Sequence, residues 1–152
     1  NMLDPSIAAA KMYSNASRFI EAYHAVLQPL AREAELPAMA LDILLFIANN
    51  PDKDTARDVC QFRGMKPGIV SVHVDRLVAE GLIARQSVPG DRRKTKLVCT
   101  EKAADIVSKG RGLQRRFASG LLDGIDEQSL DVFHRCLAAV DRNVDKIRKN
   151  GV

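Results

Sequence analysis

Aromatic side chains are scarce in this chain of 152 residues: it has no tryptophan, and phenylalanine and tyrosine together make up 5% of the sequence. The hydrophobic fraction is nevertheless 46%, so a folded core must be aliphatic and rich in alanine. This composition excludes an intrinsically disordered chain and suits packed helices.

Cysteine is also sparse, with three residues (Cys60, Cys99 and Cys136) that lie far apart and form no CxxC motif. An odd and scattered set is not a disulfide framework. No apolar run reaches the roughly 18 residues of a membrane span, and no signal peptide stands at the start. These absences predict a cytoplasmic protein with reduced thiols and no membrane attachment.

Catalytic and metal-binding patterns are missing too. The three histidines (His24, His73 and His134) lack the spacing of metal ligands. The sequence has no nucleophile paired with a base, no catalytic carboxylate pair and no phosphate-binding glycine loop. We therefore expect neither an enzyme nor a metal or other cofactor.

The sequence does contain an uneven charge distribution. Residues 85–116 carry ten positive and three negative charges, a net of +7, whereas the formal net charge of the whole chain is +4. A basic excess in one segment is typical of a surface that meets a polyanion, although a solvated basic helix face would give the same count. The secondary structure predicted around residues 85–116 must therefore decide between these two interpretations.

Apolar periodicity predicts a helix over residues 7–33, which Pro29 should kink or end, and a second helix over 38–49. A third, capped by Asp54 or Thr55, should run to about residue 62. A fourth should begin at Pro67 and stop at Gly81. Thr100 should cap a fifth helix that ends near residue 122. Its main apolar positions are Ile106, Leu113, Phe117 and Leu121.

Two short runs rich in β-branched and polar residues, 82–88 and 94–99, flank the turn-forming sequence Pro89-Gly90-Asp91-Arg92. They predict a hairpin whose tip carries Asp91-Arg92-Arg93. The expected fold class is therefore mainly α with a small β wing (α+β). It is a winged helix-turn-helix with long N- and C-terminal dimerisation helices.

The sixth predicted helix, capped by Asp126, has the sharpest periodicity in the chain. Its apolar residues alternate at spacings of three and four, as in a coiled-coil seam. They are Leu130, Phe133, Leu137, Val140, Val144 and Ile147. The pattern favours a homodimer seam shared with the first helix over a helix that only covers its own core. We therefore expect residues 1–36 and 123–152 to form a dimerisation region and 37–122 a DNA-binding region.

Two short helices joined by a tight turn and followed by a basic hairpin are typical of a DNA-binding head. The second helix, about 66–80, should enter the major groove, and the wing, 85–98, the minor groove. Arg76 could instead form an ion pair with an acid such as Asp75, and His73 could simply pack. The expected contacts are Lys66, Ser71, Val72, His73, Arg76, Arg85, Asp91, Arg92, Arg93, Lys94 and Lys96.

Four segments in order also carry a family resemblance. They are Val70-Ser71-Val72-His73-Val74-Asp75-Arg76-Leu77, Glu80-Gly81-Leu82-Ile83-Ala84-Arg85, Asp91-Arg92-Arg93 and Leu97-Val98-Cys99-Thr100-Glu101-Lys102. Together they resemble the recognition helix, Gly-Leu turn, Asp-x-Arg wing and following helix start of the MarR (multiple antibiotic resistance regulator) family.

The resemblance implies a repressor that binds a pseudo-palindromic double-stranded operator as a two-fold dimer. It implies that Asp91 holds Arg93 and that Arg93 enters the minor groove. It also implies release by a small, often aromatic, anionic effector, in a pocket between the dimer helices and the reading head. The candidate lining residues there are Tyr13, Phe19, Tyr23 and Phe46.

The chain departs from the family pattern in its recognition helix, which opens with Lys66-Pro67-Gly68 and has Val72 where arginine is frequent. Cys99 also replaces the usual leucine. Two alternative functions stay open on the sequence. One is a winged helix that binds another protein without an operator, and the other is a regulator that senses oxidants through a cysteine.

Overall fold

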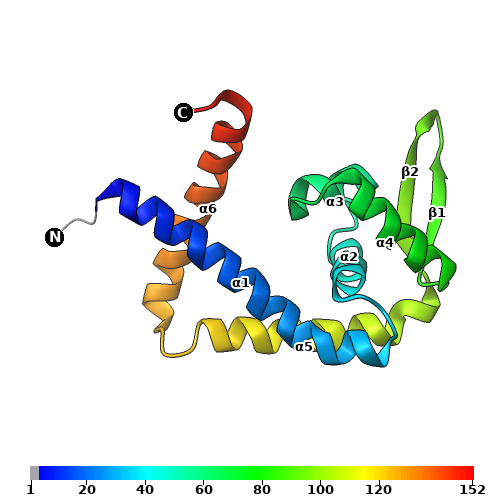
Figure 1. The fold of residues 1–152 in the computed structure, drawn as a ribbon, viewed down its shortest axis with the longest axis horizontal. Helices are drawn as coiled ribbons and strands as arrows, with labels where there is room; N and C mark the ends of the chain where they lie inside the picture. Colours follow the sequence, from blue (N-terminus) through cyan, green and yellow to red (C-terminus); the bar gives the residue numbers. More distant parts are fainter. Residues whose placement is uncertain (1–3) are drawn as a thin grey trace. The chain divides into compact units, whose positions relative to one another are not determined.

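The computed structural model describes residues 4–152, and its element order confirms the predicted fold class (Figure 1). The helices are α1 (Pro5–Glu33), α2 (Ala38–Asn49), α3 (Ala56–Arg63), α4 (Pro67–Ala79), α5 (Ala104–Leu121) and α6 (Glu127–Asn150). Strands β1 (Ile83–Val88) and β2 (Asp91–Cys99) form one antiparallel ribbon, and a 3-10 turn (Glu101–Ala103) precedes α5. Over residues 4–152, no helix combines the length and apolar character that crossing a membrane requires.

The chain forms two compact units, which divide between Arg115 and Arg116. The predicted dimerisation and DNA-binding regions, 1–36 with 123–152 and 37–122, are assignments of role, and they stay a prediction. Residues 1–3 of the first region lie outside the described residues.

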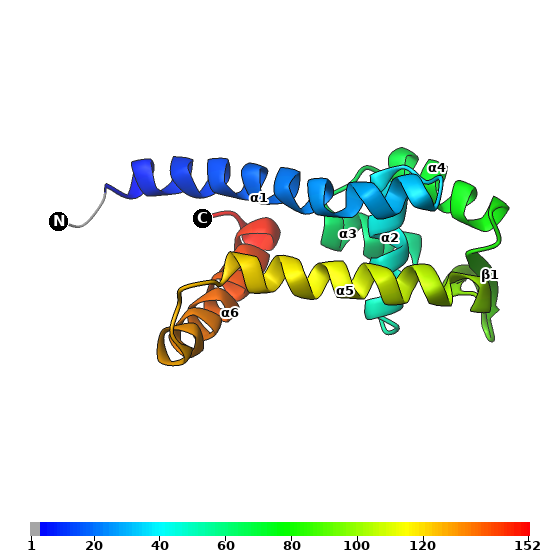
Figure 2. The same cartoon turned by 90° about the horizontal axis from the view of Figure 1, so that it is seen from below.

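Helix α2 is the centre of the first unit, where it lies between α1 and the first part of α5 (Figure 2). Its residues Ala40–Ile47 are all buried, and Leu41, Ile43, Leu44 and Leu45 have no exposed surface. Around it pack Leu27 and Leu30 of α1, Val59 of α3, Val70, Val74 and Leu77 of α4, and Leu97 of β2. The core is thus mainly aliphatic, as the low aromatic content of the sequence predicts.

Helix α1 begins at Pro5, because the Asp4 carboxylate accepts the backbone N–H of Ser6 at 2.8 Å and so caps the first turn. Pro29 does not end the helix, which continues to Glu33. The carbonyl that Pro29 leaves without a helical donor belongs to Ala25, an exposed residue whose carbonyl water can reach. The alternative in which Pro29 ends the helix is therefore wrong.

Helices α3 and α4 begin and end where their sequence signals predict. The Thr55 hydroxyl accepts the Asp58 N–H at 3.1 Å, and the Asp58 carboxylate accepts the Thr55 N–H at 3.2 Å, which completes a capping box. Gly64 follows α3 with a φ of 64°, the left-handed conformation that lets the chain turn sharply. Pro67 then opens α4. The turn therefore fixes the direction in which α4 leaves α3.

The start of α5 differs from the prediction. Thr100 does not cap the helix, because its hydroxyl donates to the Gly81 carbonyl at 2.6 Å. Lys102 Nζ donates to the neighbouring Glu80 carbonyl at 2.7 Å. The two bonds join the end of the wing to the end of α4, and α5 begins only after the 3-10 turn.

The inward face of α5 also differs. Its buried residues are Val107 and Gly110, whereas the predicted Ile106, Leu113 and Phe117 are half-buried and Leu121 is exposed. Arg111, next to Gly110, donates to the Ala48 carbonyl at 3.1 Å and to Asn49 Oδ1 at 2.9 Å. A cation at the last carbonyls of α2 stabilises that helix end.

The second unit contains α6, whose predicted cap is confirmed: the Asp126 carboxylate accepts the Ser129 N–H at 2.6 Å. Helix α6 buries none of its residues. Its seam residue Leu130 is half-buried. The other five, Phe133, Leu137, Val140, Val144 and Ile147, are 38–48% exposed. Within residues 4–152, a large part of this apolar stripe is therefore left exposed.

Candidate nucleic-acid interface

The outer face of α4 is exposed, as a recognition helix requires. Lys66 and Ser71 are exposed, Val72 has an exposed fraction of 66%, and His73 is half-buried. Val70, Val74 and Leu77 hold the opposite face in the core. Gly68 has open space around it, so the first turn presents its backbone directly. Predicted contacts and core residues thus separate onto two sides of one helix.

Arg76, for which the sequence left open a DNA contact or an ion pair with an acid such as Asp75, does form an ion pair, but with Glu80. Its Nε lies 3.0 Å from Glu80 Oε1, and its Nη2 donates to the Glu35 carbonyl at 2.7 Å. Asp75 as its partner is therefore wrong. These bonds hold Arg76 against the connection between α1 and α2, and a phosphate contact from it would have to compete with them.

Asp75 instead pairs with Arg85 of β1, through Oδ1 and Nη2. Both side chains are half-exposed, so the pair is worth about 1 kcal/mol or less in stability. Its position matters more than its energy, because it connects the recognition helix to the first strand of the wing. Arg85 is thereby positioned beside α4.

The wing has an irregular register that the sequence did not predict. Ile83 to Ser87 pair in order with Cys99 to Thr95, but Val88 then pairs with Asp91 around the two-residue turn Pro89-Gly90. Residues Arg92, Arg93 and Lys94 therefore bulge out of the ribbon without a strand partner. The prediction that Asp91-Arg92-Arg93 forms the hairpin tip is corrected accordingly: β2 begins at Asp91, and the cations lie on a bulge behind the turn.

Asp91 braces this bulge through the main chain. Its Oδ1 accepts the backbone N–H of Arg93 at 3.0 Å, so the carboxylate replaces the strand partner that the bulge lacks. The Arg93 side chain is left exposed. The implied support of Arg93 by Asp91 is thus a bond to its backbone and leaves its guanidinium available.

The base of the wing is anchored to the loop before α3. The Leu97 N–H donates to the Asp54 carbonyl at 2.6 Å, and Lys96 Nζ lies 3.9 Å from the Asp54 carboxylate. The four remaining predicted cations (Lys66, Arg92, Arg93 and Lys94) have no ion-pair partner within residues 4–152. A polyanion could therefore bind these four cations without breaking an internal ion pair.

The sequence missed Arg57, an exposed residue of α3. With Ser71 and Arg85 it lines a cleft of about 360 Å³ between α3, α4 and the wing. Net charge counted along the sequence did not single out Arg57, because the stretch around it, residues 51–84, has no net charge. The capping box of α3 would have placed it on the first turn of that helix.

The Asp75–Arg85 pair gives a first prediction. Asp75→Ala should leave the free energy of unfolding within about 1 kcal/mol of wild type, because the pair is half-exposed. DNA affinity should fall by less than about ten-fold, since Asp75 holds Arg85 and carries no positive charge itself. Urea unfolding and fluorescence anisotropy with duplex DNA measure the two effects. Glu127→Ala, which removes an exposed carboxylate of α6, is the control. A loss of several kcal/mol in stability would contradict this role for Asp75.

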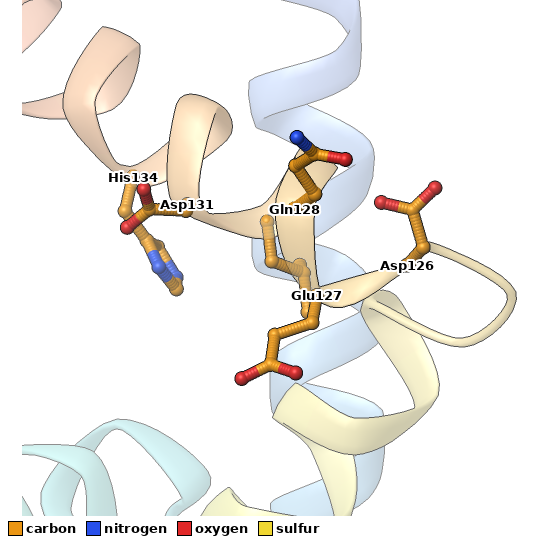
Figure 3. Close-up of a pocket in the computed structure, with 6 residues that line it drawn as sticks. Asp126, Glu127, Gln128, Asp131 and His134 are labelled. Carbon is orange, nitrogen blue, oxygen red and sulfur yellow. The ribbon is translucent and has the colours of Figure 1, made fainter.

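The cysteines and the depression on α6 offer weaker support for a functional site than the face of α4 and the wing do. Cys60 and Cys99 are half-buried and Cys136 is exposed. Burial raises the pKa of the Cys99 thiol, which disfavours the reactive thiolate. Figure 3 shows the open depression around the first turns of α6, where Glu127, Asp131 and His134 are drawn as sticks. Within residues 4–152, no group of three or more His, Cys, Asp or Glu side chains is suited to hold a metal ion.

Two of the four candidate effector-pocket aromatics line a common cavity of about 350 Å³ in the first unit. Phe19 and Tyr23 lie there together with Asp42, Phe62 and Arg63. Tyr13 is 78% exposed, and Phe46 is buried in the core. We call this cavity the Asp42 pocket; its remaining lining residues are Ile20, His24, Met39, Gly64 and Met65.

Comparison with known proteins finds a family model that matches part of the chain and solved structures that share its fold. Residues 34–94 match the model of the MarR family. A MarR family transcriptional regulator from Listeria monocytogenes, solved with a 26mer DNA, is 15% identical, with 99% of this chain and 98% of that chain covered and a TM-score of 0.79. Bordetella bronchiseptica BpsR, whose DNA binding is regulated by 6-hydroxynicotinic acid, is 18% identical, with 86% and 98% covered and a TM-score of 0.65.

A MarR regulator from Methanosarcina mazei Go1 is 18% identical, with 91% of this chain and 97% of that chain covered and a TM-score of 0.71. At these identities the solved structures establish the fold, and the family model identifies the segment that contains α2 to the start of the wing. Residues 34–94 are therefore similar to the MarR family, and the chain has the fold of solved members of that family.

Proposed function

We propose that this protein is a transcription regulator that binds double-stranded DNA in a sequence-specific manner. One observation carries the proposal: the exposed face of α4 lies beside a wing whose bulge presents three unpaired cations, Arg92, Arg93 and Lys94. A helix with this exposure fits the major groove, and cations on a narrow ribbon fit the minor groove next to it. The Listeria relative solved with DNA supports this assignment.

The residues divide into two roles. Lys66, Arg92 and Lys94 provide phosphate contacts, which set affinity and register. Ser71 and Val72 face the bases, where the Val72 side chain suits the methyl group of thymine and His73 flanks the contact. Arg93 is the residue that enters the minor groove. The positive electrostatic field around it and the position of the wing depend also on Arg76, Arg85 and Lys96.

The operator in this proposal is a pseudo-palindrome bound by a homodimer. The apolar stripe of α6, exposed in the single chain, is the surface through which the second copy binds. A two-fold dimer presents two α4 helices to half-sites separated by about one or more turns of DNA. The function is repression released by a small molecule in the Asp42 pocket, and the ligand-regulated Bordetella relative supports such control.

Arg93→Ala is the test of the DNA-binding assignment. Operator affinity should fall by about 1–3 kcal/mol, and the slope of log affinity against log salt should decrease by about one unit. Fluorescence anisotropy over a salt series measures both, on a site first located by footprinting the intergenic DNA upstream of the gene.

Arg142→Ala removes the same charge from an exposed position of α6, an element that is not part of the wing, and off the apolar stripe, and it should bind as wild type does. Equal affinities for wild type and Arg93→Ala would reject the wing assignment. A folded dimer that protects no DNA would reject operator binding itself, and would favour a winged helix that binds another protein.

A further inference from the structure

Two exposed apolar side chains on α4 take no part in the hydrophobic core. Ile69 is 42% exposed and Val72 is 66% exposed. Residues three positions apart are neighbours on a helix surface, with their Cβ atoms about 5–6 Å from one another. Both are β-branched, which makes them poorer helix formers than alanine. Neither the core nor the helix explains this pair, and we call Ile69 and Val72 the apolar pair of α4.

The polar side chains of α4 offer few hydrogen bonds to base edges. Between Pro67 and Ala79 they are Ser71, His73, Asp75 and Arg76. Arg76 is engaged by a carboxylate at 3.0 Å and by a backbone carbonyl at 2.7 Å, and Asp75 pairs with a cation of the wing. His73 is half-buried. The Ser71 hydroxyl both donates and accepts, so it suits several bases. Hydrogen bonds from residues 67–79 therefore give little discrimination between base pairs.

The apolar pair matches the one apolar group that base edges present in the major groove. That group is the C5-methyl of thymine, and apolar side chains recognise thymine through it. Base pairs are stacked about 3.4 Å apart along the duplex, whereas the Cβ atoms of the pair are about 5–6 Å apart. Ile69 and Val72 are therefore spaced to contact methyl groups that lie one or two base pairs apart.

The surroundings of the apolar pair complement DNA. A Cβ at Gly68 would meet no atom within 4 Å, so the backbone beside the pair is open to close approach. Lys66, which precedes the helix, and the bulge of the wing provide cations without an ion-pair partner within residues 4–152. Phosphates border the base edges of a groove. An apolar strip close to unpaired cations therefore fits a major groove better than it fits an uncharged surface.

We propose that Ile69 and Val72 read thymine methyl groups in the major groove, and that these methyl groups are the main basis on which α4 selects its operator. This inference rests on the proposed function, because it names the bases that the DNA-binding face selects. It extends that function by adding Ile69 to the DNA contacts. It also predicts operator half-sites in which two thymines lie one or two base pairs apart.

Replacing thymine by deoxyuridine tests the inference, because uracil keeps the base pair and its O4 acceptor and lacks only the methyl group. The operator located by footprinting is synthesised with uracil at one symmetry-related pair of positions at a time. At one or two such pairs, wild-type affinity should fall about 15-fold, since burying one methyl group is worth about four-fold and each half-site loses one. The slope of log affinity against log salt should not change, because every phosphate contact remains.

Two variants identify the side chains that contact the methyl groups. In Val72→Ala the effect of uracil at one pair of positions should shrink to about two-fold or less, and in Ile69→Ala the effect at the other should shrink in the same way. Val132→Ala is the matched control, because it makes the same change at a residue of α6 that is 47% exposed and lies off the apolar stripe. It should keep both effects in full. Circular dichroism should show that all three variants are folded, since each replaced side chain is exposed.

Three results would overturn the inference: an operator half-site without thymine, uracil that lowers affinity by no more than about two-fold at every position, or uracil effects that persist in both Val72→Ala and Ile69→Ala. The wild-type series decides even if a variant does not fold. A protein that protects an operator and tolerates uracil throughout it refutes only the methyl readout. A folded protein that protects no DNA refutes the proposed function, and the inference with it.

Discussion

Leu137→Glu is expected to convert the proposed dimer to a monomer and to lower operator affinity by about 100-fold or more. Leu137 is central in the apolar stripe of α6, and its side chain is 45% exposed in the single chain. In a two-fold dimer, two carboxylates would be placed in an apolar contact, where each costs several kcal/mol unless it is paired. Once the two heads are separate, the gain from binding both half-sites together, about 100- to 10,000-fold, is lost.

Ala138→Glu is the matched control for this variant. It adds the same carboxylate at the neighbouring exposed position, one residue round the helix from the stripe. Sedimentation analysis should show a monomer for Leu137→Glu and a dimer for Ala138→Glu, and circular dichroism should show that both stay helical, because no residue of α6 is buried in the single chain. A Leu137→Glu protein that remains a dimer and binds DNA normally would place the dimer surface elsewhere.

Gly110→Ala should lower the free energy of unfolding by about 1–3 kcal/mol, although alanine is the better helix former. A Cβ at Gly110 would lie 2.5 Å from Leu45 Cδ2 and 2.9 Å from Cδ1. Leu45 cannot withdraw, because it is fully buried in the middle of α2. The methyl group would therefore push α5 away from α2 or force Leu45 out of its rotamer.

Gly112→Ala is the control within the same helix. No atom lies within 4 Å of the Cβ that it would add, so only the backbone preference changes. Its stability should rise by about 0.5–1 kcal/mol, and urea unfolding followed by circular dichroism measures both variants. If Gly110→Ala were as stable as Gly112→Ala, α5 would not pack on α2 at this position.

The sequence was sufficient for the helices whose limits are set locally. Periodicity located α2 and α4, and the side chains that cap α3 and α6 belong to the same turn as the amides they bind. Such signals involve residues two to four positions apart, so one sequence contains the whole interaction. The basic segment was found for the same reason, since charge can be counted along the chain.

Features that depend on distant partners were missed. The Thr100 hydroxyl has local capping chemistry, but Gly81, nineteen positions earlier, offers it a carbonyl. No local pattern indicated the Asp42–Arg63 pair, because Asp42 lies within an otherwise apolar helix and its partner is on another element. The bulge of the wing was equally hidden: strand register is set by pairing across the ribbon, and consecutive cations do not reveal which of them lack a partner.

The same bulge affects how copies of the protein meet one another. A two-stranded ribbon has two open edges, and open edges invite strand addition and fibre growth. Here β2 is broken by Arg92, Arg93 and Lys94, which interrupt its hydrogen-bond ladder and repel the like charges of another wing. An approaching strand therefore finds the outer edge of β2 interrupted, and the cations that could bind a polyanion also protect this edge from strand addition.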